Sequence, residues 1–339
     1  MMKKFMALFL ALMFALLCTA AMAEGSTESV VSIPNGDHEV PATVCMPSGE
    51  GKFPVVVMLH GTGSNRDEAG NGYKMAAPVL AEKYGIATVR IDFMGSGDST
   101  ADYTGYTFES AVSDAVAAAN YAKTLEQIDG EHIGVMGWSQ GGTDALLCAA
   151  RAADVFTSVV TWAGAPDLSD MLTDELYEQA KANDYFVMDF DWREPLNVSL
   201  QWCDDVANTD VLAEFAEGYT GPVLAIHGKE DTTVDPEWSN KIVAASKNEL
   251  HRGDGSHLQC VCRGRFPLPV SGGGRDGQIL QRDAALIFRN PKLQSAGETA
   301  ASPALFFNVY FPSTTESFTS FSASLRSNAP PSATVTRTS

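Results

Sequence analysis

Positive charge is scarce in this sequence. Its 339 residues carry 23 Lys and Arg against 42 Asp and Glu, which gives a formal net charge of −19. A nucleic-acid-binding protein needs a basic face, so this balance excludes that class of function. We expect no nucleic-acid partner and interpret the acidic excess as a solubilising surface.

Cysteine is equally scarce and has no useful spacing. One of the six cysteines, Cys18, lies in the N-terminal apolar run. The remaining number is odd, and the spacing matches no metal-ligand pattern. We therefore expect free buried thiols and neither a disulfide framework nor a metal site. These cysteines are Cys45, Cys148, Cys203, Cys260 and Cys262.

No apolar run is long enough to span a bilayer. Residues 1–4 are Met-Met-Lys-Lys, residues 5–17 are apolar, and Ala-Met-Ala follows at 21–23. A short basic region, a short apolar run and a small-x-small motif predict a secretory signal peptide over residues 1–23. The protein is expected to be secreted, periplasmic or at the cell surface, with no membrane association after cleavage.

Nucleotide-binding motifs are also missing. The glycine-rich stretch Met-Gly-Ser-Gly-Asp-Ser at 94–99 has no following Lys-Ser/Thr and lacks the GxGxxG spacing, which excludes a phosphate-binding loop. We expect no bound cofactor.

The stretch Gly-Trp-Ser-Gln-Gly-Gly at 137–142 carries the strongest functional pattern. An apolar run at 132–136 precedes it and reads as a buried strand, and residues 143–150 read as a helix. Strand, Gly-x-Ser-x-Gly turn and helix form the nucleophile elbow of α/β-hydrolases. Ser139 is the predicted nucleophile. The amide of Gln140, at the start of the helix, is a predicted oxyanion donor.

A second glycine-rich loop, His-Gly-Thr-Gly-Ser-Asn at 60–65, follows the apolar strand 55–59. In α/β-hydrolases a loop after a central strand supplies the other oxyanion donor. Thr62 is the predicted residue, with its backbone N–H paired with that of Gln140. The alternative is a strand-ending turn with a structural histidine.

Strands and helices alternate along the chain. Strands are expected near 86–93, 157–164 and 221–228, and helices over 72–84 and 108–125, the first ended by Gly85. A β-hairpin is expected around Asn-Gly-Asp at 35–37. The fold class is α/β, an α/β-hydrolase fold with a mainly parallel central sheet and helices on both faces.

The alternation breaks over residues 166–221, where acidic helical segments carry several aromatic residues. A helical cap inserted after the sixth strand would lie over the edge of the sheet where ligands bind. Trp192 and Trp202 in this insertion, and Trp138 beside the nucleophile, are candidate substrate contacts. For any single aromatic the alternative is the insertion's own core.

The acid and the base are expected late in the chain. Asp231 follows the strand 221–228 and is favoured as the acid over Glu230 and Asp235. His257 follows a turn and is the predicted base. The order Ser139, Asp231, His257 is that of α/β-hydrolases, while His227, at a strand end, is expected to be structural.

Residues 30–257 resemble secreted α/β-hydrolase esterases, most closely the feruloyl (cinnamoyl) esterase-like group of gut and rumen bacteria. The matching motifs are the loop at 60–63, the stretches at 92–99 and 137–142, residues 219–231, and Glu-Leu-His at 249–251. The resemblance implies Ser139 as nucleophile, Asp231 as acid, His257 as base, and an oxyanion hole at Thr62 and Gln140. It also implies an aromatic-bearing insertion at 166–221.

The resemblance stops at residue 257. Residues 258–339 hold 4 Asp and Glu against 8 Lys and Arg, and residues 302–339 hold 15 Ser and Thr. This composition predicts a poorly packed or disordered tail, either genuine or produced by a shift of reading frame near residues 251–258. A shift before residue 257 would make His257 accidental. The expected domains are 1–23, 24–257 and 258–339.

Together these patterns predict a serine carboxylic-ester hydrolase that works through an acyl-enzyme. By the resemblance, its substrate is a hydroxycinnamoyl ester of plant cell-wall material, as a small molecule or linked to polysaccharide. The alternatives are a serine peptidase or acetyl esterase of the same fold, and a binding protein of this fold with impaired catalysis. The sequence leaves the oligomeric state open.

Overall fold

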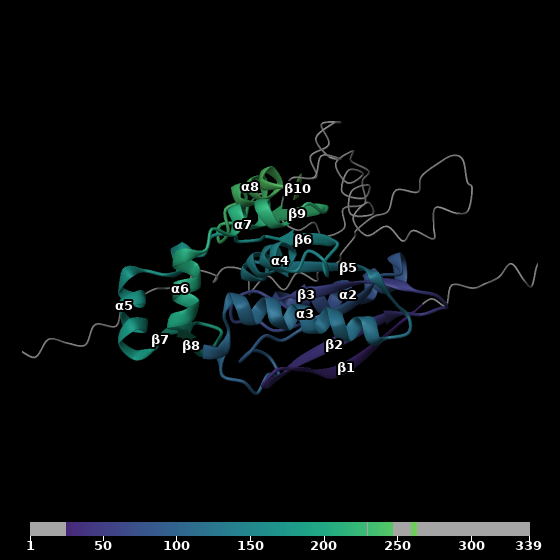
Figure 1. Cartoon of the computed structure of the whole chain (residues 1–339), viewed down its shortest axis with the longest axis horizontal. Coiled ribbons are helices and arrows are strands. Elements are labelled where there is room, and N and C mark those ends of the chain that lie inside the picture. Colours follow the sequence, from purple (N-terminus) through teal and green to yellow (C-terminus); the bar gives the residue numbers. More distant parts are fainter. Residues whose placement is uncertain (1–24, 229, 247–258, 263–339) are drawn as a thin grey trace, which may run out of the picture.

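A computed structural model describes residues 25–228, 230–246 and 259–262 of the chain. Its main feature is an eight-stranded sheet of order β1-β2-β4-β3-β5-β6-β9-β10 (Figure 1). The first two pairings, β1 with β2 and β2 with β4, are antiparallel, and the other pairings are parallel. The strands are β1 (Ser26–Asn35), β2 (His38–Pro47), β3 (Phe53–Leu59), β4 (Ala87–Ile91), β5 (Ile128–Trp138), β6 (Ser158–Trp162), β9 (Val223–Gly228) and β10 (Gln259–Cys262).

Seven α-helices accompany these strands in the described part of the chain. They are α2 (Gly72–Tyr84), α3 (Phe108–Thr124), α4 (Gln140–Arg151), α5 (Asp174–Asn183), α6 (Leu200–Asn208), α7 (Val211–Gly218) and α8 (Glu237–Ala245). Three short 3₁₀ turns are η1 (Ala69–Asn71), η2 (Tyr103–Gly105) and η3 (Ser169–Met171). None of the helices in these residues is both long and apolar enough to cross a membrane.

Two hydrophobic cores lie on opposite faces of the sheet. Side chains alternate along a strand, so Val55 and Val57 of β3 pack in the core that includes α3 and α4, whereas Val56 and Met58 pack against α2. All four side chains are fully or almost fully buried. Burial on both faces explains why β3 reads as an unbroken apolar run, and the expected α/β-hydrolase architecture is confirmed.

Local sequence signals set the ends of several helices. Gly85 adopts a left-handed conformation (φ 62°) at the end of α2, and its amide bonds back to the helix. Thr107 begins α3 with a capping box in which its hydroxyl accepts from the Ser110 amide. These helices accordingly lie where the sequence predicted them.

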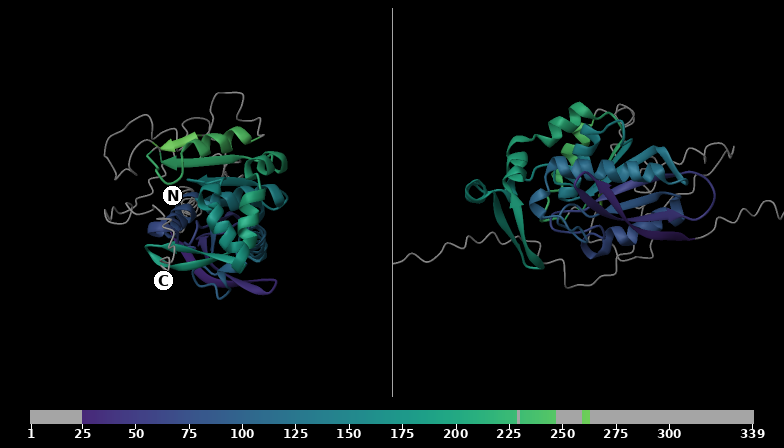
Figure 2. Two further views of the ribbon diagram at one scale, coloured as in Figure 1. Left: turned by 90° about the vertical axis from the view of Figure 1, so that its left-hand side faces the viewer. Right: turned by 60° about the horizontal axis from the view of Figure 1, so that its bottom comes forward.

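The segment after β6 contains a strand pair as well as helices. Besides α5, α6 and α7 it forms a separate antiparallel hairpin, β7 (Tyr185–Phe190) and β8 (Arg193–Ser199). The sequence predicted only helices there, because the acidic residues between the aromatics obscure the alternation of two short strands. In Figures 1 and 2, α5, α6 and the hairpin lie together at one end of the molecule.

This insertion has aromatic packing of its own. The Trp202 side chain on α6 is 1% exposed, and its ring lies 6.3 Å from that of Phe186 on β7. Trp202 therefore has the environment of a core residue rather than of a substrate contact, which was its predicted role. Trp192, in the hairpin turn, is 47% exposed and lies 5.3 Å from the ring of Phe190.

Strand β10 lies in the part of the sequence assigned to the tail. Gln259–Cys262 pairs parallel with β9 at the edge of the sheet. The sheet therefore extends past residue 257, where the sequence placed the end of the hydrolase domain. The remainder of the tail and residues 1–23, the predicted signal peptide, lie outside the described residues.

The two tryptophans of the insertion give a test of its packing. We expect Trp202→Ala to lower the free energy of unfolding by about 3–5 kcal/mol, because it leaves a large cavity. Trp192→Ala, the matched control, should cost less than about 1 kcal/mol, because that side chain is half in solvent. Urea denaturation followed by circular dichroism measures both, and equal losses would contradict the assignment of Trp202 to the core.

Candidate active site

Ser139 sits in a strained backbone conformation between β5 and α4. Its φ is 53° and its ψ −120°, values that a residue with a Cβ rarely adopts. Its amide donates to the Trp162 carbonyl (3.1 Å), and its own carbonyl accepts from the amides of Gly142 (2.9 Å) and Ala165 (3.1 Å). Hydrogen bonds from the neighbouring backbone thus keep Ser139 in this strained conformation, as in a nucleophile elbow.

Three glycines make this conformation possible. A Cβ at Gly137 would lie 1.7 Å from the Gly141 carbonyl oxygen, and one at Gly141 would lie 2.2 Å from the Leu59 carbonyl oxygen. A Cβ at Gly142 would lie 2.6 Å from the Gly164 Cα. Since these obstacles are backbone atoms that cannot turn aside, no larger residue fits at any of the three positions.

The loop after β3 comes into contact with Ser139. A Cβ at Gly61 would lie 3.2 Å from the Ser139 Cβ. The Thr62 hydroxyl donates a hydrogen bond to the side-chain oxygen of Gln140. The structure thus brings Ser139, Thr62 and Gln140 together, although the loop and the elbow are almost 80 residues apart in the sequence.

His60 links this loop to the residues that follow β4 through hydrogen bonds at both ring nitrogens. The Phe93 amide donates to His60 Nε2 (3.2 Å), so Nδ1 carries the proton and donates to the Gly61 carbonyl (2.8 Å). Burial lowers the pKa of His60 and keeps the ring neutral, as this arrangement requires. The structural role considered for this histidine therefore agrees with its contacts.

Glu68 is a second support that the sequence did not reveal. Its carboxyl is buried and accepts hydrogen bonds from the amides of Gly61 and Ala69, both at 2.7 Å. Burial raises its pKa. With the Gly61 amide occupied, the candidate oxyanion donor is the next amide, that of Thr62. No local pattern marks Glu68, which is why sequence reasoning missed it.

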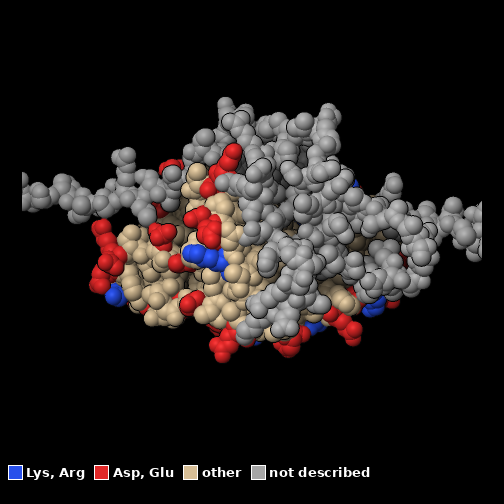
Figure 3. Space-filling model, turned by 90° about the horizontal axis from the view of Figure 1, so that it is seen from above, with Lys and Arg blue, Asp and Glu red and all other residues tan. Residues whose placement is uncertain are grey.

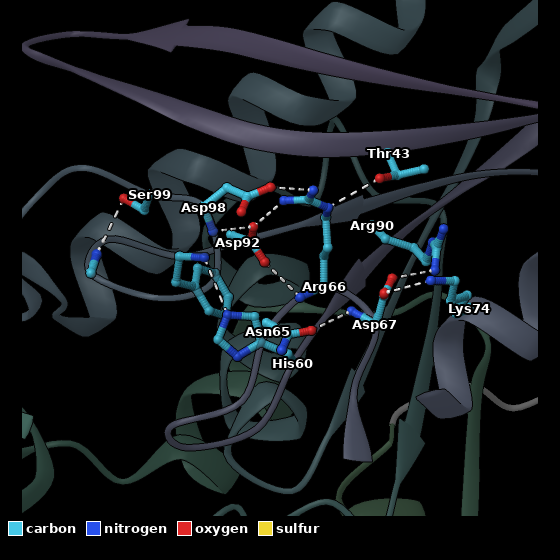
Figure 4. A network of polar contacts seen from close by, with 12 residues as sticks. Thr43, His60, Asn65, Arg66, Asp67, Lys74, Arg90, Asp92, Asp98 and Ser99 are labelled. Atoms are coloured by element: carbon cyan, nitrogen blue, oxygen red, sulfur yellow. Dashed lines mark hydrogen bonds and ion pairs between the residues drawn. The ribbon is translucent and has the colours of Figure 1, made fainter. Parts of the chain in front are cut away.

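Arg66 ties the same loop to the loop after β4 (Figure 4). Its amide donates to Asp92 (2.7 Å), while its guanidinium pairs with both Asp92 and Asp98 and donates to Thr43 (3.1 Å). A Cβ at Gly97 would lie 2.2 Å from the Asp92 carboxyl. The glycine-rich stretch 94–99 therefore packs directly against the Asp92 carboxyl.

The two carboxylates bonded to Arg66 differ in burial, which gives a matched pair of variants. Asp92 is fully buried and Asp98 is 70% exposed. We expect Asp92→Ala to cost about 3–5 kcal/mol of folding free energy, because it removes one partner of a buried pair. Asp98→Ala should cost no more than about 1 kcal/mol. Denaturant titration tests this, and similar losses for the two variants would contradict it.

Asp231 lies in the turn after β9. It accepts hydrogen bonds from the amides of Thr233 (2.9 Å) and Val234 (3.0 Å), and its Oδ2 lies 3.4 Å from His227 Nε2. Burial favours the neutral acid, but the nearby His227 ring and the two amide hydrogen bonds outweigh it and leave the pKa of Asp231 below its usual value. Its surroundings therefore favour a carboxylate.

His227 has partners at both ring nitrogens. Nε2 lies 3.0 Å from the Val234 carbonyl, so it donates, and Nδ1 lies 2.8 Å from the Ser239 hydroxyl. The ring is fully buried. These contacts tie β9 to α8, which agrees with the structural role expected for this histidine.

The two other candidate acids have different surroundings. Asp235 accepts from the Glu237 amide (2.9 Å) at the start of α8, and Glu230 is exposed. The predicted base, His257, lies outside the described residues. The part of the chain that the structure describes contains no group of three or more side chains able to hold a metal ion.

Aromatic side chains lie beside the elbow and the loop. The Trp138 ring stacks on that of Trp162 with centroids 4.4 Å apart. From the β7–β8 hairpin, Arg193 donates to the Gly63 carbonyl, and the Phe190 ring lies 3.1 Å from where a Gly63 Cβ would be. The insertion therefore reaches the oxyanion loop through Phe190 and Arg193, which the sequence did not single out.

The strained serine after a parallel strand, together with the strand order, defines an α/β-hydrolase fold. Residues 72–262, more than half of the chain, match the model of the prolyl oligopeptidase family, and the chain belongs to that family.

Two characterised relatives match part of the chain. It is 31% identical over 200 residues to a 2,6-dihydropseudooxynicotine hydrolase of Paenarthrobacter nicotinovorans, covering 57% of this chain and 48% of the relative. It is 30% identical over 125 residues to the quorum-quenching protein AidA of Acinetobacter baumannii, covering 36% and 39%. The chain thus spans half or less of the length of these two relatives.

Solved structures share the fold. Est1E of Butyrivibrio proteoclasticus, solved with ferulic acid, matches with a TM-score of 0.53 at 23% identity, covering 64% of this chain and 86% of that one. The hypothetical protein PA2218 of Pseudomonas aeruginosa matches with a TM-score of 0.54 at 19% identity, covering 66% and 83%. At these identities the similarity concerns the fold.

Proposed function

We propose that this protein is a serine hydrolase that cleaves carboxylic esters through an acyl-enzyme. The observation that carries the proposal is the strained Ser139 in contact with the loop of Thr62, whose side chain is bonded to that of Gln140. A serine held in this way presents its hydroxyl at the start of α4, where helix amides favour negative charge.

In the proposed reaction, Ser139 Oγ attacks the ester carbonyl as its proton passes to the base. The oxygen of the tetrahedral intermediate accepts hydrogen bonds from the amides of Thr62 and Gln140. The C–O bond to the alcohol then breaks, and the alcohol leaves with that proton. Water next attacks the acyl-serine by the same route and releases the acid.

We assign the base to His257 and the acid to Asp231. The position of Asp231 after β9 and its lowered pKa support its part, because a carboxylate is needed to stabilise the imidazolium. The chain order supports His257.

For the substrate we propose a hydroxycinnamoyl ester. The partly buried rings of Trp138 beside the elbow and of Phe190 against the oxyanion loop would provide aromatic surfaces for such an acyl group. The fold shared with Est1E gives weaker support. Acidic side chains predominate over basic ones in the described part of the face in Figure 3, which favours a neutral ester over an anionic one.

Membership of the prolyl oligopeptidase family keeps a peptidase as the second candidate. An acetyl esterase, or a binding protein without catalysis, would need the same fold but not the same aromatic surroundings. We also propose export with cleavage after Ala23, which N-terminal sequencing of the secreted protein tests.

Replacing the nucleophile tests the reaction. Ser139→Ala should lower kcat on a p-nitrophenyl ester by about 10³-fold or more, because it removes the attacking oxygen. His257→Gln should give a loss of the same order. Ser113→Ala, an exposed serine on α3, is the control and should keep wild-type turnover.

A fluorophosphonate probe should label the wild-type protein at Ser139 and leave Ser139→Ala unlabelled. Retained esterase activity in Ser139→Ala would refute the serine mechanism. An unlabelled, inactive wild-type protein would point to a binding protein.

The substrate class is tested by comparing kcat/KM for methyl ferulate, an acetylated sugar and a dipeptidyl amide. We expect methyl ferulate to be the best of the three, since only its acyl group can stack on the aromatic side chains. Rapid amide cleavage with negligible turnover of methyl ferulate would establish the peptidase instead.

A further inference from the structure

A chain of hydrogen bonds runs from the oxyanion loop into the core beneath the elbow. The Thr62 hydroxyl donates to Gln140 Oε1, and Gln140 Nε2 donates to the Tyr106 hydroxyl (2.6 Å). The Tyr106 hydroxyl donates to Asp144 Oδ2 (2.7 Å). In each of these three hydrogen bonds the donor is the side chain nearer the loop and the acceptor is the one nearer Asp144. The four side chains therefore form one continuous network.

The network joins three separate elements. Thr62 lies in the loop after β3, Tyr106 lies just after η2, and Gln140 and Asp144 lie one turn apart on α4. Gln140 is 1% exposed, Tyr106 3% and Asp144 0%. In such surroundings a hydrogen bond is stronger than in water, and its loss leaves buried polar groups without partners.

Burying the Asp144 carboxyl lowers the stability of the fold. Its Oδ1 is buried without a hydrogen-bond partner among the described residues. Burial raises the pKa of Asp144 to about 8, against opposing effects of the Tyr106 hydrogen bond and Arg151. An apolar side chain would fill this part of the core without that cost, so packing alone does not account for an acid here.

The two residues at the outer end of the network are those that supply the proposed oxyanion donors. The Gln140 amide is fixed by α4, whereas Thr62 stands in a loop between two glycines. The side-chain bond between Thr62 and Gln140 therefore limits how far the two amides can separate. Small displacements in such a site have large kinetic effects, up to about 10²-fold for 1 Å.

We propose that Tyr106 and Asp144 are positioning residues that, through the side chain of Gln140, hold the Thr62 amide at its working distance from the Gln140 amide. This inference rests on the proposed serine hydrolase function and extends it to two residues that would act through Gln140.

The test compares two Tyr→Phe variants. Tyr106→Phe removes the hydroxyl that links Gln140 to Asp144. Tyr219, like Tyr106, is 3% exposed as a residue, and Tyr219→Phe removes a hydroxyl that donates to the Pro222 carbonyl (3.2 Å) just before β9. On a p-nitrophenyl ester we expect Tyr106→Phe to lower kcat by about 10–100-fold with KM changed less than about threefold, because oxyanion contacts strengthen in the transition state. Tyr219→Phe should keep wild-type kinetics.

Two further measurements separate positioning from a general loss of stability. The affinity for a trifluoromethyl ketone, which forms an oxyanion adduct with serine, should fall in parallel with kcat/KM in Tyr106→Phe. At the outer end of the network, Thr62→Ser should keep at least about ten times the kcat of Thr62→Val, because only serine retains the donor to Gln140. If Tyr106→Phe does not fold, the comparison of Thr62→Ser with Thr62→Val tests the positioning role of the network instead.

The outcomes distinguish this inference from the proposed function. If the wild-type protein turns over the ester but Tyr106→Phe matches Tyr219→Phe, or Thr62→Val matches Thr62→Ser, the positioning role is refuted and the hydrolase stands. A wild-type protein that neither turns over esters nor reacts with the ketone refutes the proposed function, and the inference with it.

Discussion

The strained backbone of Ser139 is the constraint on which the centre of this fold depends. Its positive φ persists because hydrogen bonds from the end of β6 and the start of α4 hold the residue on both sides. The same geometry brings Gly141 so close to Leu59 that no side chain fits between them. The positions of β3, β5, β6 and the start of α4 are therefore fixed relative to one another. The oxyanion loop continues from the end of β3, and its first residues lie next to Ser139.

Polar contacts, rather than apolar packing, hold that loop. Within the loop, His60 and Glu68 are bonded to Gly61, and the Arg66 amide donates to Asp92. A glycine-rich loop loses much conformational entropy on folding, so it needs several fixed anchors to present one amide in one direction. Because His60 and Arg66 are bonded to Phe93 and Asp92 in the loop after β4, a displacement of that loop would move the candidate oxyanion hole.

The sequence predicted features that follow from short-range patterns. The elbow, the buried strands, helix α2 with Gly85 at its end, and the fold class all follow from local spacing. The β7–β8 hairpin was missed because its strands are short and lie between two helices, α5 and α6. Glu68, and the pairing of Tyr106 with Asp144, were missed because each depends on contacts made only in the folded chain. Trp202 was misread because an aromatic residue in an insertion looks the same in sequence whether its ring faces a ligand or the core.

Two carboxyl groups near the carboxyl edge of the sheet have opposite pKa shifts, and the difference separates their possible roles. Asp231 receives hydrogen bonds from two amides and lies 3.4 Å from a ring nitrogen of His227, and these contacts lower its pKa and favour the charged form. Asp144 is completely buried, which raises its pKa to about 8 although its single donor, the Tyr106 hydroxyl, acts in the opposite direction. The acid of a catalytic triad must be charged to stabilise an imidazolium. Asp144 is therefore unsuited to that part at neutral pH, although it lies closer to Ser139 in sequence, and the surroundings of Asp231 suit it.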